Sequence, residues 1–545
     1  MTATPEIFTR KASGLVRVMS PYSAFIYNIL TMGLIFPWTY LWAPGALPGG
    51  RLVWGILLAM LFEIPIAYVY VWLSTALPRS GGDYVFQSRV FGGGLAFTVV
   101  MSGFVIWILQ WVALSGWLVS YLGFAPLFLG LGATMGNAMF SSWGIFFTTG
   151  TGIIIVSIIN ALLSMVLLTS GFKNYVRFQH VMWWGTLLCF ATVFIVLFTT
   201  PASEFVTRLN AFAVASGGSP DFYQTAVNAV TAAGIDLHPP FSLLATLLVA
   251  PIAWTSLQWA TYSSQQNGEI KDARNFKSQT FIMVGSLVAT GILLALLAVG
   301  IERVAGSEFL YVAGAGYWSL IAEANINGFN LWPPILAVAL TGSPLVVLII
   351  GLGYLLNGFQ IVCNCYIGMT RVLVAMSLDR LLPEWLSKVD EKLHTPVNAH
   401  LAYFLASIPV ILAYNLVGGW VGLTLGVTFG CGYVFVITCI AGALLPYRAK
   451  DLYEASPGAK YKLGGIPMIT ILGVLGGILG TLMVLAFLFA PQLGVLGTWS
   501  AANPWPQVIT FGIILFSWIW YILAKNSQKS KGINVDFAFK EIPPE

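Results

Sequence analysis

The chain has 545 residues, 58% of them hydrophobic and 8% charged, and a formal net charge of +5. Soluble proteins carry about 25% charged residues, so this composition excludes an ordinary soluble fold. The basic residues are spread over many segments, which does not indicate nucleic-acid binding, and we expect no nucleic-acid partner.

Long apolar segments predict the architecture, since a membrane-spanning helix needs about 20 apolar residues and about twelve segments qualify. They lie near 21–43, 52–76, 95–121, 144–170, 179–199, 241–264, 279–301, 342–370, 398–415, 418–446, 465–490 and 504–524. Their length excludes the short strands of an outer-membrane barrel, and backbone groups in lipid must pair within the protein. We predict an all-α polytopic membrane protein with the lipid bilayer around it.

The basic residues predict the orientation. With an even number of spans both termini share a side, and all but three of the 25 Lys and Arg residues then fall on that side. The exceptions are Arg51, Arg208 and Arg303. Because Lys and Arg accumulate in cytoplasmic loops, we expect cytoplasmic termini and a place in the cell membrane.

The spans also suggest an internal repeat. Spans 1 and 6 both look interrupted, and five spans per half would make the second half inverted, a known transporter design. The expected parts are a cytoplasmic tail (1–20), a first five-helix repeat (21–200), an extracellular loop (201–240), a second, inverted five-helix repeat (241–446), helices 11 and 12 (447–524) and a cytoplasmic tail (525–545). We further expect a surface helix within 371–397 and a flexible tail from Lys525.

Span 1 carries polar and small residues near its middle, namely Asn28, Thr31, Met32 and Gly33. Glycine tolerates non-helical dihedrals, and an unwound turn here would offer backbone N–H groups to a carboxylate. The alternative is a continuous helix with small packing residues.

Span 6 contains Pro251, which removes a backbone hydrogen bond. Trp254, Thr255, Ser256 and Gln258 follow within two turns. A proline kink would explain this span alone. Breaks at corresponding positions of spans 1 and 6 together favour discontinuous helices with a substrate site between them.

Glu63 lies about twelve residues into span 2, where an ionisable group costs roughly 3 kcal/mol and indicates function. It is a candidate for coupling a proton. The alternative is a protonated glutamate making one structural hydrogen bond.

Further polar residues lie inside spans 3 and 8. Gln110 belongs to span 3, and Asn357, Gln360 and Asn364 form one stripe of span 8 at i, i+3, i+7 spacing. The stripe is expected to line a cavity, with Asn357 and Gln360 in coupling or gating. Its alternative role is hydrogen bonding between helices.

The sequence gives little support for a catalytic site or a metal site. All five cysteines fall within predicted spans and the four histidines lack metal-ligand spacing. No catalytic or ATP-binding motif is visible, so we expect no catalytic residue, metal or cofactor, and transport energy from gradients or exchange. A membrane enzyme such as an intramembrane transferase, or a channel, remains the alternative.

Three sequence stretches resemble amino acid permeases of the amino acid–polyamine–organocation superfamily. They are Leu77 to Tyr84, Gly268 to Phe276, and Arg371 to Pro383 with its continuation Thr395 to Ala399. All three follow predicted spans, in order, and are expected to be cytoplasmic loops. In the first, Pro78 ends the helix and Gly81-Gly82 permits a tight turn, so a short polar loop is expected there. The resemblance covers about residues 15–450.

The resemblance implies a leucine-transporter-like fold with two extra helices, and secondary active transport of an amino acid or related organic amine. The substrate would meet the backbone at Asn28–Gly33 and Trp254–Gln258. The chain departs from the family at Leu30-Thr31-Met32-Gly33, where glycine-serine-glycine is usual, and in span 5, where Thr186 lies near the place of a lysine found in some proton-coupled members. The coupling ion, H⁺ or Na⁺, and the oligomeric state are left open.

Overall fold

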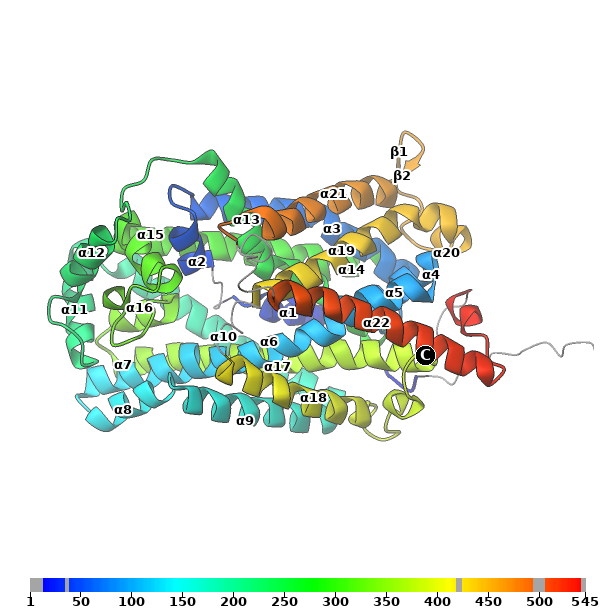
Figure 1. Ribbon diagram of the computed structural model, residues 1–545, viewed down its shortest axis with the longest axis horizontal. Helices are drawn as coiled ribbons and strands as arrows, with labels where there is room; N and C mark the ends of the chain where they lie inside the picture. The colour runs from blue at the N-terminus through cyan, green and yellow to red at the C-terminus, as the bar shows by residue number, and fades with distance from the viewer. Residues whose placement is uncertain (1–12, 35–38, 418–423, 494–504, 541–545) are drawn as a thin grey trace, which may run out of the picture.

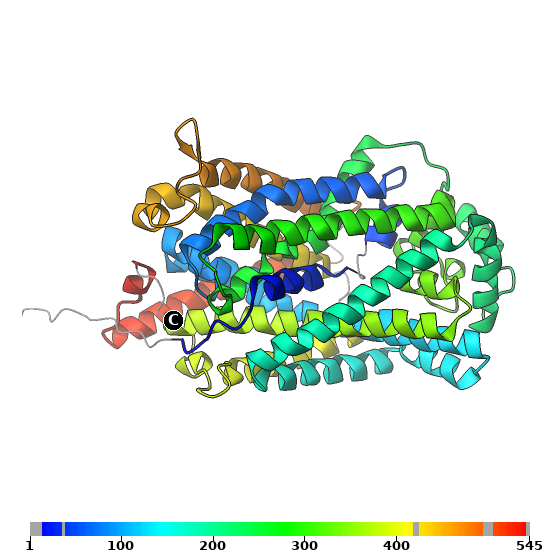
Figure 2. The ribbon, with the colours of Figure 1, turned by 180° about the vertical axis from the view of Figure 1, so that it is seen from behind.

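The computed structural model describes residues 13–34, 39–417, 424–493 and 505–540. These residues are almost wholly helical, which confirms the predicted all-α class. The helices run lengthwise through one bundle, and the described chain begins and ends at the same end of it (Figures 1 and 2).

The connection at 200–242 divides the elements into two parts. The first part contains α1 (Pro21–Met32), α2 (Thr39–Ala46), α3 (Leu52–Ala76), α4 (Gly82–Phe91), α5 (Gly93–Val100), η1 (Met101–Ile106), α6 (Trp107–Trp117), η2 (Leu118–Phe124), α7 (Ala125–Met135), α8 (Ala138–Phe146), α9 (Gly150–Thr169) and α10 (Phe172–Thr199). The connection at 200–242 contains η3 (Ala202–Glu204), α11 (Phe205–Ala215) and α12 (Phe222–Ala232).

The second part also consists mainly of helices. It contains α13 (Leu243–Leu257), η4 (Gln258–Glu269), α14 (Phe276–Thr280), η5 (Phe281–Gly285), α15 (Ser286–Trp318), η6 (Ala322–Ala324), α16 (Pro333–Ala339), α17 (Pro344–Leu378), η7 (Glu384–Ser387), α18 (Val397–Leu416), α19 (Thr424–Arg448), α20 (Lys450–Glu454), the hairpin β1 (Lys462–Leu463) and β2 (Ile466–Pro467), α21 (Met468–Phe489), α22 (Trp505–Ser530) and η9 (Val535–Lys540).

Eleven helices in the described part of the chain are long and apolar enough to cross a membrane. The expected span at 21–43 is not among them because it is divided into α1 and α2. Lipid-facing surfaces are apolar, as with Ile159 on α9, Ile195 on α10 and Leu515 on α22. The chain is therefore a multi-pass membrane protein whose first span is interrupted.

The broken elements lie at the centre of the bundle. α1 crosses the middle of the molecule (Figure 2). Its Tyr27 stacks on Tyr262 of η4 with ring centroids 6.1 Å apart. The two interrupted spans therefore contact each other through α1 and η4, although the limits of the two repeats stay a prediction.

The stretch Leu77 to Tyr84 makes the expected tight turn. α3 ends at Ala76 before Pro78, and Gly81 has a φ of 102°, which favours glycine. The turn is not a polar surface loop, however. The Gly81 N–H donates to the carbonyl of Gln265 over 2.7 Å, and α4 follows as a buried helix before span 3.

Two expectations about the end of the bundle near the termini are wrong. Residues 371–397 hold no surface helix: α17 continues to Leu378, and only the short η7 follows. The tail after Lys525 is packed in its described part, because Val535, Ala538 and Phe539 of η9 are buried. Apolar side chains in an otherwise polar tail explain this packing.

Candidate functional site

The break in span 1 begins where α1 ends. Gly33 takes a left-handed conformation, with φ 74° and ψ 84°, and its N–H donates to the Ile29 carbonyl. Residues 35–38, which follow, lie outside the described residues. Asn28 and Met32 are buried and Thr31 is half-buried. Thr31 and Met32 therefore lie in the last turn of α1, Gly33 is its cap and Asn28 lies one turn earlier.

Span 6 changes helix type at the predicted place. α13 continues through Pro251, because neighbouring helices can compensate a proline within a membrane bundle. At Gln258 the chain becomes η4, a 3₁₀ segment of 12 residues with a kink at Gln266, whose φ of −111° and ψ of 30° are not helical. Such helices rarely exceed three or four residues, and long ones often mark hinges.

The predicted residues of span 6 surround this change. Trp254, Thr255 and Ser256 are buried in the last turn of α13, and Gln258 begins η4. The Thr255 carbonyl accepts from the Trp259 indole N–H over 2.9 Å and, over 3.4 Å, from the Gln258 amide. Side chains thus hold the backbone where the helix tightens.

Asn28 joins the two interrupted spans. Its Nδ2 donates to Ser263 Oγ over 3.0 Å and to the Ile282 carbonyl over 3.1 Å. Its Oδ1 accepts from the Ser263 backbone N–H over 2.9 Å. One side chain therefore connects α1 with η4 and η5.

The polar stripe of span 8 faces α1. Asn364 Nδ2 donates to Thr31 Oγ1 over 2.6 Å, and Asn357 Nδ2 donates to the Leu30 carbonyl over 3.3 Å. Gln360 Nε2 donates to Asn364 Oδ1 over 2.7 Å and to the Tyr175 hydroxyl. In this conformation the stripe links α17 to α1, as its alternative role requires, and its part in gating stays a prediction.

Glu63 forms a separate contact with span 6. The buried indole Nε1 of Trp254 donates to Glu63 Oε2 over 2.6 Å. The other carboxyl oxygen is buried without a hydrogen-bond partner in the described part of the chain. Gln110 is buried in α6, where the neighbouring Trp111 packs on Trp259 of η4, ring centroids 5.8 Å apart.

The geometry suits a small zwitterion or amine. The end of α1 carries carbonyls without intrahelical partners and the negative pole of the helix dipole, which attract an ammonium group. Among the described residues, five amide oxygens of η4 and of the α17 stripe that faces α1 lack hydrogen-bond partners, and those of Gln258, Asn357 and Gln360 lie nearest the break. Unpaired buried acceptors of this kind need an explanation, and a bound donor provides one.

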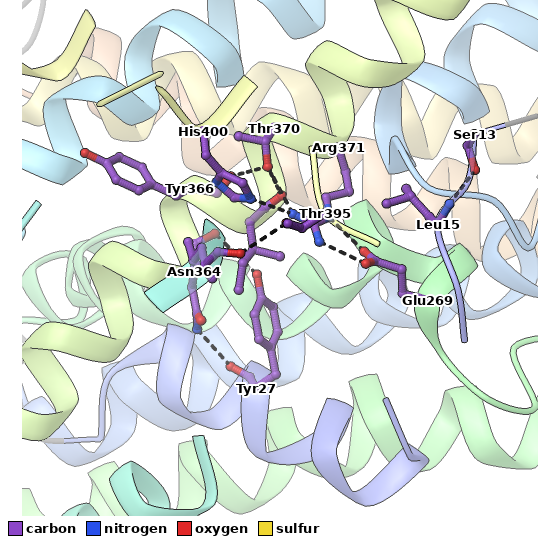
Figure 3. Close-up of polar contacts among 12 residues, drawn as sticks. Ser13, Leu15, Tyr27, Glu269, Asn364, Tyr366, Thr370, Arg371, Thr395 and His400 are labelled. Atoms are coloured by element: carbon purple, nitrogen blue, oxygen red, sulfur yellow. Dashed lines mark hydrogen bonds and ion pairs between the residues drawn. The ribbon is translucent and has the colours of Figure 1, made fainter. Parts of the chain in front are cut away.

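A buried ion pair holds the C-terminal end of η4, the end away from the change at Gln258. Arg371 Nε and Nη2 donate to the two carboxylate oxygens of Glu269 over 2.7 and 2.9 Å. Its Nη1 lies 3.2 Å from His400 Nε2 and 3.2 Å from Thr370 Oγ1 (Figure 3). The guanidinium also lies 4.9 Å from the centroid of the Phe172 ring. This arrangement fastens η4 to α17 and α18.

Buried polar side chains of η4 extend the closure toward α3 and α4. Gln265 Nε2 donates to Asp83 Oδ2 over 2.5 Å, and the hydroxyls of Thr438 and Tyr70 donate to Asp83 Oδ1. Asn267 Nδ2 donates to the Ser74 carbonyl over 2.8 Å. Burial raises the pKa of Asp83 to about 6, against these hydrogen bonds, which lower it.

Sequence reasoning missed most of this closure. Glu269, Arg371 and Asp83 stood in the recognised stretches but were interpreted as loop residues, and Tyr27 and Tyr175 were not singled out. Opposite charges at the ends of spans 6 and 8 were the available signal for the ion pair. The polar run from Ser263 to Asn267, within a predicted membrane span, was the signal for the rest.

Comparison with known proteins gives two findings. A family model described as amino acid permease matches residues 22–516. A curated viral protein, "Uncharacterized protein 399" of Sulfolobus islandicus rod-shaped virus 1, is 32% identical over 102 residues, 17% of this chain and 26% of that protein. The match therefore spans about a quarter of that relative.

Proposed function

The chain belongs to the amino acid permease family, and we propose that it is a secondary active transporter that moves an amino acid or related organic amine by alternating access. The family consists of transporters of amino acids and related compounds, not of enzymes.

One observation carries the proposal: the two interrupted spans meet, and Asn28 bonds them together. A substrate held between them contacts both halves of the protein at once. The proposed binding residues are Asn28, Thr31, Met32 and Gly33 of span 1; Trp254, Thr255, Ser256 and Gln258 of span 6; and Gln110 and Asn364 beside them. Carbonyls at the end of α1 receive the ammonium group.

The alternating step follows from the closed end of the bundle. The Glu269–Arg371 pair and the Asp83 contacts all lie on the η4 side of the break. To release substrate at the end where the described chain begins and ends, η4 and α17 must separate there. Asn357 and Gln360, which bond α1 and Tyr175, rearrange with them.

Glu63 is the proposed coupling group. It contacts the last turn of α13 through Trp254. A change in the charge of Glu63 therefore changes a hydrogen bond at the substrate site. Transport proceeds as symport with H⁺ or Na⁺, or as exchange. In the proposed orientation both termini are cytoplasmic in the cell membrane, because basic residues accumulate on their side.

Gradient-driven uptake into proteoliposomes tests the mechanism. A labelled amino acid that the protein transports should accumulate when a pH or sodium gradient is imposed, or when unlabelled substrate is trapped inside. Flux that never saturates would instead indicate a channel. Chemical conversion of the substrate would indicate an enzyme.

A further inference from the structure

A basic cleft of about 700 Å³ lies outside the substrate site, at the end of the bundle where η4 ends. Three segments far apart in the sequence line it: the stretch before α1, the loop from η4 into α14, and the loop from α20 into β1. The proposed transport mechanism uses none of these residues.

Four cations converge on the cleft, namely Arg17, Arg274, Lys277 and Lys460, against the single carboxylate of Asp272. All four are exposed. Within the described residues, neither Arg274 nor Lys277 forms an ion pair, and Lys460 lies 5.3 Å from the centroid of the Tyr461 ring. The proposed orientation in the membrane explains why basic residues lie on this side of the protein. It does not explain why four of them line one cleft.

Aromatic rings form the wall of the cleft. Phe276 and Tyr461 pack with ring centroids 4.9 Å apart, and Trp72 at the end of α3 packs edge-on against both, at 4.9 and 6.1 Å. The Trp72 indole also donates to the Gly458 carbonyl over 3.0 Å. Trp and Tyr are enriched where membrane meets water, so the Tyr461 side chain, which is 38% exposed, supports a cleft at headgroup depth.

The neighbouring hairpin offers an apolar contact to lipid. β1 and β2 project from the side of the bundle beside the start of α21 (Figure 1). The side chains of Leu463 and Ile466 are 63% and 49% exposed at this hairpin. Apolar side chains next to lysines, here Lys460 and Lys462 before Leu463, are typical of a segment that lies in the membrane interface.

We propose that this cleft binds the phosphate group of an anionic membrane lipid. Arginine presents a planar fork that matches phosphate oxygens, and the lysines add charge. Leu463 and Ile466 rest on the lipid's glycerol and upper acyl region. Such a lipid joins the segment before α1 to the end of η4, two segments already connected by the Met19 carbonyl, which accepts from the Lys271 N–H over 2.8 Å.

Lipid retention measured by native mass spectrometry tests the proposal. The full-length protein is equilibrated with equal amounts of phosphatidylglycerol and phosphatidylcholine carrying identical acyl chains. Wild type should retain phosphatidylglycerol preferentially. The R274Q/K277Q/K460Q variant should reduce that preference roughly a hundredfold, since each of the three cations near an anionic surface contributes a factor of about five.

A matched variant controls for net charge. K173Q/R177Q/K388Q removes three exposed cations elsewhere on the same side and should leave the preference unchanged. L463S/I466S should weaken lipid retention. It should not alter any displacement of the bound lipid by inorganic phosphate. Equal loss in both triple variants would overturn the proposal. The proposal would also be overturned if inorganic phosphate occupied the cleft as well as lipid does and L463S/I466S left lipid retention unchanged. The cleft would then bind a free anion.

Discussion

Asn28 uses three of its hydrogen-bonding positions on protein groups, two on Ser263 and one on Ile282. An asparagine side chain offers two donors and one acceptor oxygen, so both donors are occupied. In this conformation Asn28 positions the break, while Gln258 keeps an amide oxygen without a partner among the described residues. The two residues therefore have different roles at the same site.

At the residue scale, Glu63 should set the pH dependence of transport. Glu63→Gln keeps the contact with Trp254 but removes the titrating proton, so uptake measured between pH 5 and 8, about the physiological range, should lose its pH dependence. Trp254→Phe, which leaves the carboxyl group without its donor, should retain a pH dependence while lowering apparent affinity about tenfold. An unaltered pH profile in Glu63→Gln would remove this residue from coupling.

Asp83 should make folding stability depend on pH. Its folded-state pKa of about 6 lies above the ordinary aspartate value, so the folded protein holds the proton more tightly. The resulting stabilisation is fully present below pH about 4 and is lost as the pH rises through about 6. Melting temperatures of wild type and Asp83→Asn, measured across this range, should show a weaker pH dependence in the variant.

Asp390 provides the control for that experiment. Backbone N–H groups of Leu393 and Lys392 lower its pKa, so its contribution has the opposite sign. Asp390→Asn should not flatten the pH dependence that Asp83 causes. Equal slopes in wild type and Asp83→Asn would show that Asp83 does not titrate in the folded protein.

At the element scale, the interruption of span 1 was predictable and the nature of the change in span 6 was not. Gly33 among polar residues indicates a break because only glycine adopts its left-handed conformation cheaply. Pro251 pointed to a break in span 6, yet α13 continues through it and tightens at Gln258. Packing of Trp254 and Trp259 against other helices decides that position, and local sequence does not contain this information.

A single substitution in the Glu269–Arg371 ion pair should open the contact between η4 and α17. Glu269→Gln leaves Arg371 buried without its carboxylate, and breaking a buried pair costs about 3–5 kcal/mol. The closed conformation should lose population, and buried Cys365 of α17 should react faster with a maleimide, read out by mass spectrometry. Glu204→Gln, which breaks an exposed pair with Arg208, should change nothing. Slow labelling of folded Glu269→Gln would contradict the closure.

At the scale of the whole molecule, composition and span length were sufficient to predict the class. Apolar segments of membrane length, and a resemblance carried by three short stretches, led to the family that the comparison confirms. Opposite charges and a polar run in a predicted span signalled the buried contacts of Asp83 and Arg371, but the sequence does not identify the partners, because they lie on elements distant in sequence, as Thr438 does from Asp83. Such pairings depend on how the helices assemble.

Counterflow tests the central claim, that one site between spans 1 and 6 opens to either side in turn. Proteoliposomes are loaded with unlabelled compound, and entry of the same labelled compound is followed across a panel of amino acids and amines. For at least one compound the account predicts saturable, transient accumulation that requires internal substrate and is lost in Gln258→Leu. Absence of counterflow across the whole panel, with folded and inserted protein, would contradict alternating access.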